Sequence, residues 1–524
     1  MSASASQDCI TTEKSKEISV TERPMSTNSE DIEKILDKSK EVTVTARPIS
    51  SDSEDVEKKA ELTDAEAWNI DPENPMNWPL YKKAYHSFAA AILAFSVSCG
   101  SSLITPSAFF IMADFNVTLT QSILVLTVFV LGLALGPMLA APISETKGRR
   151  VVYISTSIVY MLFTLGAGFS KTFSSLLACR FFAGMSGGPV LAIGAGTNAD
   201  MFSVRYRAIA GAFFVLMPFL GPSLGPVIGS FVAFEKQTWQ WSQYVTVFIS
   251  LVAWVLVLPM HETYEKIILQ KRALKAGIVS TEEELKPAEK LKLLFTITLF
   301  RPIRMIFTEP IVSLFALYNA LSFSILFSLF EAYPYVYITV YGFNTWQYGL
   351  TFLGVGLGVI LAVPTAIIVD QLYYQKHYDA ALAEGKPCNP EYRLLVGQLG
   401  SFGIPIGLFW FAWTSRPDIH WIVPTLAGIF FAWGNVCVFI CAALYLVDVY
   451  GPLNGASALA ANGLLRYSLA ACFPLFIVQM YENLGIGWAT STLGFATVAM
   501  MPIPFVFYIY GPRLRAISGV GTVM

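Results

Sequence analysis

Long apolar stretches occupy most of the chain between residues 84 and 510, separated by short polar segments. A run of about 20 apolar residues indicates a membrane-spanning helix, because lipid offers no hydrogen-bond partner to unpaired backbone groups. Twelve such runs can be placed, and a charged stretch at 261–308 separates the first six from the last six. The pattern predicts an all-α membrane protein with twelve transmembrane helices in two six-helix halves, the layout of a secondary transporter.

The boundaries of the spans set the domain organisation. We place the spans, to within a few residues, at 85–110, 121–143, 151–170, 174–198, 208–233, 240–260, 309–337, 346–369, 394–413, 420–446, 455–480 and 487–510. The expected domains are a hydrophilic tail at 1–80, a first half at 81–260, a central loop at 261–308, a second half at 309–510 and a short tail at 511–524.

The first 75 residues are rich in Ser, Thr, Glu and Lys and poor in aromatic residues, which is typical of a disordered segment. They contain a tandem duplication, because residues 14–34 recur in closely similar form at 38–58. A duplicated, solvated tail is the simplest interpretation. Ser29 and Ser53 each precede an acidic pair, so phosphorylation of both is the alternative hypothesis.

Lysine and arginine are distributed unevenly between the two sides of the predicted membrane. The central loop, the loops near 147 and 386 and the tail after 510 carry many of them. The opposite side has only Lys171, Lys236 and Arg416. Because cytoplasmic loops carry an excess of basic residues, both termini are expected in the cytoplasm.

The composition and the missing motifs argue against several classes of function. Charged residues make up 14% of the chain, against about 25% in an ordinary soluble protein. There is no basic segment interleaved with aromatic residues, so no nucleic-acid partner is expected. The seven cysteines include no CxxC pair, the four histidines form no cluster, and no phosphate-binding loop occurs. We therefore expect no enzyme activity, no metal and no cofactor, with an ion gradient as the energy source.

The loop between spans two and three reads APISETKGRR over residues 141–150. Glu145 ends a predicted helix, where it can pair with Arg149 or with Arg205 and Arg207 of the next cytoplasmic loop. A pair that forms in one conformation and breaks in another biases the equilibrium between them. Asp200 with Arg205 or Arg207 is expected to form a hinge pair. The candidate switch residues are Glu145, Gly148, Arg149, Arg150, Asp200, Arg205 and Arg207; ordinary cytoplasmic basic charge is the alternative.

Span five combines regularly spaced glycines with prolines. Glycines recur every four residues on one helix face, which lets a neighbouring helix approach closely, and the prolines weaken the backbone ladder and permit a bend. The residues of this run are Gly221, Pro222, Gly225, Pro226 and Gly229. A kinked packing helix, which any transporter can contain, is the alternative.

Two ionisable residues lie inside predicted spans. Arg180 lies in span four, where a charge costs about 2.5–3.5 kcal/mol at the helix centre and is functional by default. Glu331 lies late in span seven, where an apolar setting favours its neutral form and reversible protonation. We expect Arg180 to have a functional role, and Glu331 to bind a proton or a cationic substrate and so to take part in coupling. The alternatives are an arginine paired to backbone carbonyls and an acid at the outer membrane surface.

Polar and aromatic residues in the second half can line a substrate site. Arg466 in span eleven can also pair with Glu331. The candidate binding residues are Tyr318, Asn319, Glu331, Asn435, Tyr445, Asn462 and Arg466. Each of them alone is more often a helix-packing residue than a ligand contact.

These motifs resemble those of a known family. The loop at 141–150 resembles the GxLxDRxGRR signature of the major facilitator superfamily, with Ala141, Glu145 and Thr146 in place of Gly, Asp and Arg. The glycine-proline run resembles the antiporter motif of that superfamily's exporters, and Arg180 matches its embedded arginine, which is implicated in proton transfer. Segments at 71–79, 258–264 and 450–462 resemble the fungal drug:proton antiporter group, which includes polyamine and benomyl/methotrexate-resistance transporters.

The resemblance covers about 71–515 and implies a major facilitator fold and a proton-coupled antiporter that exports small amphipathic or cationic compounds, whether drugs, xenobiotics or polyamines. The expected partners are a small-molecule substrate, protons and the lipid bilayer, and the expected state is a monomer. The plasma membrane is the expected location, with the vacuole and endoplasmic reticulum as alternatives. A symporter or facilitator that imports a nutrient is the rival function, and the glycine-proline run speaks against it. A receptor or membrane enzyme is the second rival.

Overall fold

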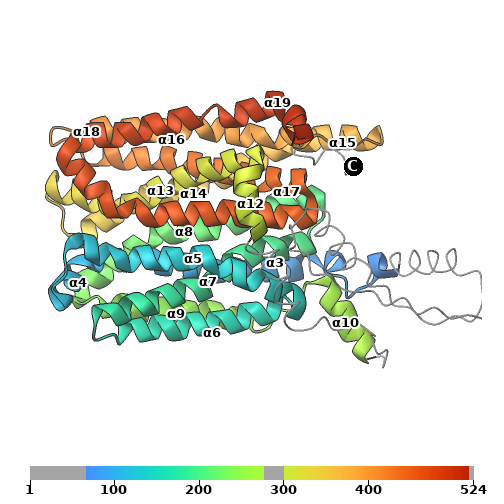
Figure 1. Cartoon of the computed structure of the whole chain (residues 1–524), viewed down its shortest axis with the longest axis horizontal. Helices are drawn as coiled ribbons and strands as arrows, with labels where there is room; N and C mark the ends of the chain where they lie inside the picture. Colours follow the sequence, from blue (N-terminus) through green and yellow to red (C-terminus); the bar gives the residue numbers. More distant parts are fainter. Residues whose placement is uncertain (1–66, 276–299, 387, 518–524) are drawn as a thin grey trace, which may run out of the picture.

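The computed structural model describes residues 67–275, 300–386 and 388–517, and every regular element in these ranges is helical. The predicted phosphorylation sites Ser29 and Ser53 lie outside the described residues. Figure 1 shows the long helices side by side along the long axis of the molecule. The structure therefore has the all-α architecture that the apolar runs predict.

The first half contains six long helices. They are α3 (Leu80–Ser102), α5 (Leu119–Lys147), α6 (Arg149–Gly168), α7 (Phe173–Met201), α8 (Val204–Lys236) and α9 (Gln240–Val257). Shorter elements are η1 (Pro75–Asn77), η2 (Thr105–Ser107), α4 (Ala108–Phe115) and α10 (Glu265–Lys275). Within this half α3 packs against α8 and α5 packs against α7.

The second half repeats this plan, and two of its elements each contain two helices. Its elements are α12 (Arg301–Thr308), α13 (Pro310–Thr339), α14 (Thr345–Val369), η4 (Asp370–Tyr374), α15 (Gln375–Ala383), η5 (Pro390–Arg393), α16 (Leu394–Thr414), α17 (Ile422–Cys472), α18 (Pro474–Met500) and α19 (Ile503–Ile517). Gly451 (φ 68°) and Gly485 (φ 75°) adopt a backbone that favours glycine, and each divides a helix in two.

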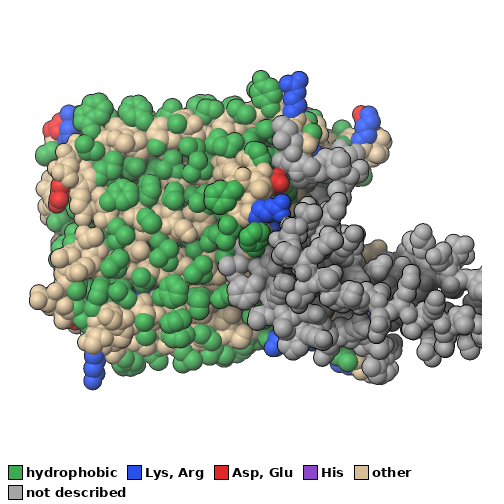
Figure 2. Space-filling model, in the orientation of Figure 1, with side chains coloured by type: hydrophobic (Ala, Val, Ile, Leu, Met, Phe, Trp, Pro, Cys, Tyr) green, Lys and Arg blue, Asp and Glu red, His purple; other side chains and the backbone are tan. Residues whose placement is uncertain are grey.

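Eleven helical segments of the described chain are long and apolar enough to cross a membrane. The expected span at 455–480 is also helical, but it is divided between the end of α17 and the start of α18. Polar residues there, such as Asn462 and Arg466, lower the hydropathy of this stretch. Figure 2 shows hydrophobic side chains over the lateral face of the molecule, as a surface in contact with lipid requires.

Local sequence fixes where two of these helices begin. Thr118 accepts the N–H of Gln121 and the Gln121 side chain accepts the N–H of Thr118, so the pair forms a capping box before α5. Asn344 and Gln347 form the same arrangement before α14. Both caps satisfy N–H groups that the first turn of a helix leaves without an internal partner.

The two halves meet along two pairs of helices. α8 packs against α14, and α5 packs against α17. We call the end of the molecule with α10 and α15 the inner end, because the lysine and arginine distribution predicts that it faces the cytoplasm, and the end with α4 the outer end (Figure 1). A site between the halves is thus bounded by α5 and α8 on one side and by α13, α14 and α17 on the other.

Candidate functional site

The inner end of the first half contains an ion pair between Arg149 and Asp200, with Arg149 Nε 3.3 Å from Asp200 Oδ2. Thr263 Oγ1 also donates to Asp200 at 3.3 Å, and Arg149 donates to Ser144 Oγ at 2.9 Å. Arg149 therefore joins the loop at Gly148 to the end of α7. Asp200 is thus the ion-pair partner of Arg149. The sequence pattern offered Glu145 as the partner of Arg149, but the Glu145 side chain is exposed.

Arg205 and Arg207 do not pair with Asp200 in this structure. Arg205 instead lies 3.6 Å from Asp379 of α15, and Gln375 donates to the backbone carbonyl of Arg205 at 3.0 Å. These contacts join the start of α8 to the second half at the inner end. Arg207 is half-buried, and its Nε has no hydrogen-bond partner in the described structure.

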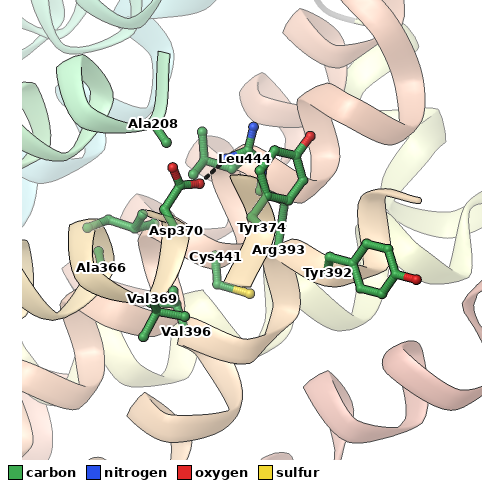
Figure 3. Close-up of a pocket in the computed structure, with 11 residues that line it drawn as sticks. Ala208, Ala366, Val369, Asp370, Tyr374, Tyr392, Arg393, Val396, Cys441 and Leu444 are labelled. Atoms are coloured by element: carbon green, nitrogen blue, oxygen red, sulfur yellow. Dashed lines mark hydrogen bonds and ion pairs between the residues drawn. The ribbon is translucent and has the colours of Figure 1, made fainter. Parts of the chain in front are cut away.

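The second half contains its own buried charge cluster at the inner end, which sequence reasoning missed. Arg393 forms an ion pair with Asp370, and its Nε lies 3.0 Å from Asp448. Its guanidinium lies 3.4 Å from the centre of the Tyr374 ring. Figure 3 shows the Asp370 carboxylate pointing toward Arg393, in a small cavity that Ala208 of α8 also lines.

The equivalent order of the spans in the two halves could have predicted this charge cluster. The loop between spans eight and nine occupies the same place in the second half as the loop between spans two and three in the first. Asp370 ends span eight and Arg393 precedes span nine, as acid and base do around the loop at Gly148.

The glycines of α8 face α3 at close range. A Cβ at Gly221 would meet the backbone of Ser98 and Cys99, and one at Gly229 would meet the backbone of Leu103. Pro222 and Pro226 lie inside the helix without ending it. The run therefore brings two helix backbones together, as close glycine packing between membrane helices does.

Arg180 is fully buried and bonded to backbone carbonyls. It donates to Val125 O at 3.3 Å, Gly100 O at 2.9 Å and Ser101 O at 3.1 Å, and it lies 4.2 Å from the centre of the Phe129 ring. These contacts join α7 to α3 and α5. These bonds are the ones expected of an arginine paired to backbone carbonyls, and a part in proton coupling stays a prediction.

Glu331 lies at the contact between the two halves. It is 8% exposed, and it lines a small cavity whose other walls, including Thr105 and Ser122, come from the first half. No ion pair with Arg466 occurs in the described part of the chain. The two residues thus occupy separate environments, and the pairing expected from the sequence is absent in this conformation.

Most of the predicted binding residues are buried polar groups with unused hydrogen-bonding capacity. Asn435 donates to Ser322 O at 3.5 Å. The atoms without a partner in the described structure are the hydroxyls of Tyr318 and Tyr445, both amide atoms of Asn319, Oδ1 of Asn462 and Nε of Arg466. Because buried polar groups are nearly always hydrogen-bonded, such a concentration of unpaired atoms indicates a place for water or a ligand. No group of three or more His, Cys, Asp or Glu side chains within the described ranges is placed to hold a metal.

Comparison with known proteins agrees with this architecture. The sequence profile of the Major Facilitator Superfamily matches residues 90–474. Polyamine transporter 4 of Saccharomyces cerevisiae is 39% identical over 482 residues, which cover 86% of this chain and 72% of the yeast protein. The MFS-type efflux pump MFS2 of Trichophyton rubrum is 39% identical over 452 residues, with 85% and 75% of the two chains covered.

Solved structures share the fold at low sequence identity. The proton:xylose symporter XylE, a protein of E. coli, superposes with a TM-score of 0.62 at 15% identity, over 83% of this chain and 97% of XylE. The human organic anion transporter MFSD10 superposes with a TM-score of 0.57 at 16% identity, over 82% and 100% of the two chains. The family profile and the relatives show that this chain belongs to the Major Facilitator Superfamily of membrane transporters.

Proposed function

We propose that the chain is a proton-coupled antiporter that exports small amphipathic or cationic organic compounds. The observation that carries the proposal is the position of Glu331, a buried carboxylate without an ion-pair partner in the described structure, where α13 meets the first half. A buried acid without a counter-charge binds a proton readily and releases it when water reaches it. Separation of the halves at the outer end would supply that water.

The coupling residue and the candidate substrate residues all belong to the second half and lie on α13 and α17. Glu331 is two-thirds of the way along α13, toward the outer end, whereas Asn319 is one-third of the way along the same helix. Export by exchange requires that proton uptake and substrate release alternate. Two sites on one helix that faces the opposite half provide for this, because one rocking movement changes the access to both. Arg180 contributes by holding α3, α5 and α7 together around this path.

The relatives support export. An efflux pump from T. rubrum and a polyamine transporter from S. cerevisiae are both 39% identical to this chain; the first supports export and the second supports polyamines as a substrate class. One proton crossing 100 mV and one pH unit supplies about 3.7 kcal/mol, enough to hold a neutral solute at a gradient of roughly 500-fold. The cycle then needs no cofactor. We place the transporter in the plasma membrane as a monomer with both termini in the cytoplasm.

The test uses purified full-length protein in sealed vesicles with an imposed pH gradient. Native protein is compared with Glu331→Gln, which keeps the shape of the side chain but cannot release a proton, and with Asp418→Asn, which removes an exposed acid. A panel of polyamines, azoles, benomyl and methotrexate is offered. We expect substrate movement against the proton flow in native protein and Asp418→Asn, and loss of its gradient dependence in Glu331→Gln.

Other outcomes separate the parts of the proposal. Exchange that survives Glu331→Gln would keep the antiporter and remove Glu331 from the coupling path. Substrate that moves in the same direction as the proton would replace export with nutrient import.

A further inference from the structure

Arg466 lies within a cage of aromatic rings. Its guanidinium carbon is 4.6 Å from the centres of the Phe323 and Phe439 rings and 4.4 Å from that of Tyr467. The cage packs against the first half of the protein. The centre of the Phe219 ring of α8 lies 5.7 Å from that of Phe323 and 5.0 Å from that of Phe439. The cation therefore lies at the interface between the halves that the transport cycle opens and closes.

This cation has no counter-ion in the described structure. Arg466 is 9% exposed, none of the described carboxylates lies within ion-pair distance of it, and its Nε has no hydrogen-bond partner. An arginine keeps its charge in a protein, and an unpaired buried charge is strongly destabilising. Aromatic faces offset only part of that, about 2 kcal/mol when desolvated. The position is thus stabilised by any anion that reaches it.

Three asparagines lie next to the cage, and two of them, Asn319 and Asn462, have unused polar atoms. Asn319, Asn435 and Asn462 each precede a cage member on the same helix by four residues, Phe323, Phe439 and Arg466 respectively, so each lies one turn away on the same face. Asn319 has no partner for either amide atom, and Asn462 has none for Oδ1. The cage therefore combines a fork of N–H donors, apolar ring faces and adaptable amides.

We propose that this cage binds the acidic group of an aromatic or similarly apolar organic anion, so that the preferred substrates are amphipathic acids rather than polycations. The proposal rests on the proposed function, since it names the substrate class of the same site. A carboxylate or sulfonate oxygen pair matches the planar guanidinium in two parallel hydrogen bonds. The rings of Phe323 and Phe439 then cover the apolar body of the ligand, and the asparagines bond to its polar substituents.

The charge of the site also decides between the two substrate classes of the proposed function, against the polyamines that the name of the yeast relative suggests. A polyamine carries several ammonium groups, and each needs a carboxylate or a set of acceptors when it leaves water. The cage supplies a positive charge, which repels an ammonium group. Glu331 lies in a separate cavity and is assigned to the proton.

The test measures binding without a proton gradient, so that it does not depend on the direction of transport. Purified full-length protein in lipid nanodiscs is titrated with radiolabelled p-toluenesulfonate, which stays ionised at every pH used. The neutral p-toluenesulfonamide, the cation benzyltrimethylammonium and spermidine compete. The variants are Arg466→Gln, Arg466→Lys and the control Arg416→Gln, which removes an exposed positive charge at the outer end.

We expect saturable sulfonate binding, with the neutral sulfonamide about tenfold weaker or worse, because a hydrogen bond to a charged group contributes that much. Neither cation should compete. Arg466→Gln should lose about tenfold in sulfonate affinity, Arg466→Lys should keep part of it, and Arg416→Gln should match the native protein.

Absence of saturable sulfonate binding would overturn the proposal. Equal competition by the sulfonamide or by spermidine, or unchanged affinity in Arg466→Gln, would overturn it as well. If Arg466→Gln does not fold, the order of affinity of the four ligands for native protein decides whether the site prefers an organic anion. Protein that binds sulfonate selectively but shows no proton exchange in vesicles would overturn the antiporter proposal alone.

Discussion

The carboxylate of Glu262 accepts the backbone N–H of Arg149 at 2.8 Å, across a sequence separation of 113 residues. Its other oxygen accepts the N–H of Arg150 at 3.2 Å. α6 begins at Arg149, and Gly148 before it has no side chain with which to cap the helix. Glu262 therefore supplies both the missing acceptor and a negative charge at the positive end of the helix dipole.

Loss of this cap should destabilise the inner end of the first half. Glu262→Ala leaves two N–H groups without an acceptor, and we expect it to lower the free energy of unfolding by about 1 kcal/mol. Glu262→Gln keeps one acceptor oxygen and should cost less. Thermal unfolding of the purified protein measures both, with the exposed Glu265→Ala as the control. A Glu265→Ala variant as unstable as Glu262→Ala would contradict this assignment.

The buried Arg393 cluster and the exposed Arg205–Asp379 ion pair, both at the inner end, should differ greatly in their contribution to stability. The Arg393 side chain is 2% exposed, so Arg393→Gln leaves the buried Asp370 and the partly buried Asp448 without their cation and should lower the free energy of unfolding by about 3–5 kcal/mol. The side chains of Arg205 and Asp379 are 58% and 50% exposed. Asp379→Asn should therefore lower the free energy of unfolding by at most about 1 kcal/mol.

The Asp379→Asn substitution should nevertheless change the conformational equilibrium, because the contact joins the two halves. Ala208 lines the cavity beside Asp370, so the rate at which a thiol reagent labels Ala208→Cys reports how often the inner end opens. The measurement is made in a background without other reactive cysteines. We expect faster labelling in Asp379→Asn than in native protein. Equal rates would mean that the contact does not hold the inner end closed.

Much of the fold follows from the sequence, because hydrophobic length and glycine spacing act locally. The apolar runs correspond to the helices, and Gly221 and Gly229 lie against α3 as their spacing indicates. Contacts that form between distant elements could not be derived in this way. Glu262 lies on a loop 113 residues from the helix that it caps, and no local pattern connects them.

The partners of the charged residues at the site could be predicted from the sequence only in part, for the same reason. The partners of Arg180 are backbone carbonyls, which every residue carries, so the sequence contains no side-chain signal for them. Glu331 and Arg466 carry opposite charges, but the turns of α13 and α17 place them in different environments. Charge alone could not distinguish a pair from two separate sites.

The segment before α3 should detach from α10 at low pH. Arg272 donates to Asp71 and to Glu73, each at 2.6 Å, and its hydrogen bond holds the pKa of Asp71 below its ordinary value. A lowered pKa in the folded state means that the contact is stabilising above the ordinary pKa of aspartate, about 3.9, and is lost as the pH falls through the lowered value.

Trp68 reports on this contact, because Arg272 lies 5.8 Å from the centre of its ring. Fluorine NMR of protein labelled with 5-fluorotryptophan, with the Trp68 signal assigned from Trp68→Phe, follows the segment. We expect a constant Trp68 signal at neutral pH and a shift below about pH 4. Arg272→Gln should show the shifted signal at every pH. A native signal that moves near neutral pH instead would point to a different titrating group.

Arg180 should be essential for stability, whatever part it has in proton transfer. Its guanidinium satisfies three carbonyls on two helices, and a lysine at this position cannot span them with its compact ammonium group. Arg180→Lys should therefore cost about 1–3 kcal/mol for the carbonyl groups left unpaired. Thermal unfolding of Arg180→Lys beside Glu331→Gln tests this, since Glu331 has no ion pair to lose in the described structure. Equal stability of Arg180→Lys and native protein would remove the structural role.

The contact between α8 and α3 can be tested with two matched glycines on the same helix. A Cβ at Gly225 would collide with Ser102 and with the backbone of Cys99, so Gly225→Ala must push the two helices apart. A Cβ at Gly211 would have nothing within 4 Å, so Gly211→Ala should be neutral or stabilising by up to about 1 kcal/mol, the helix preference of alanine over glycine. Overpacking at Gly225 should cost about 1–3 kcal/mol in unfolding and reduce the transport rate in vesicles. Gly225→Ala protein with native stability and transport would show that this close approach is dispensable, and the glycine run would then need another explanation.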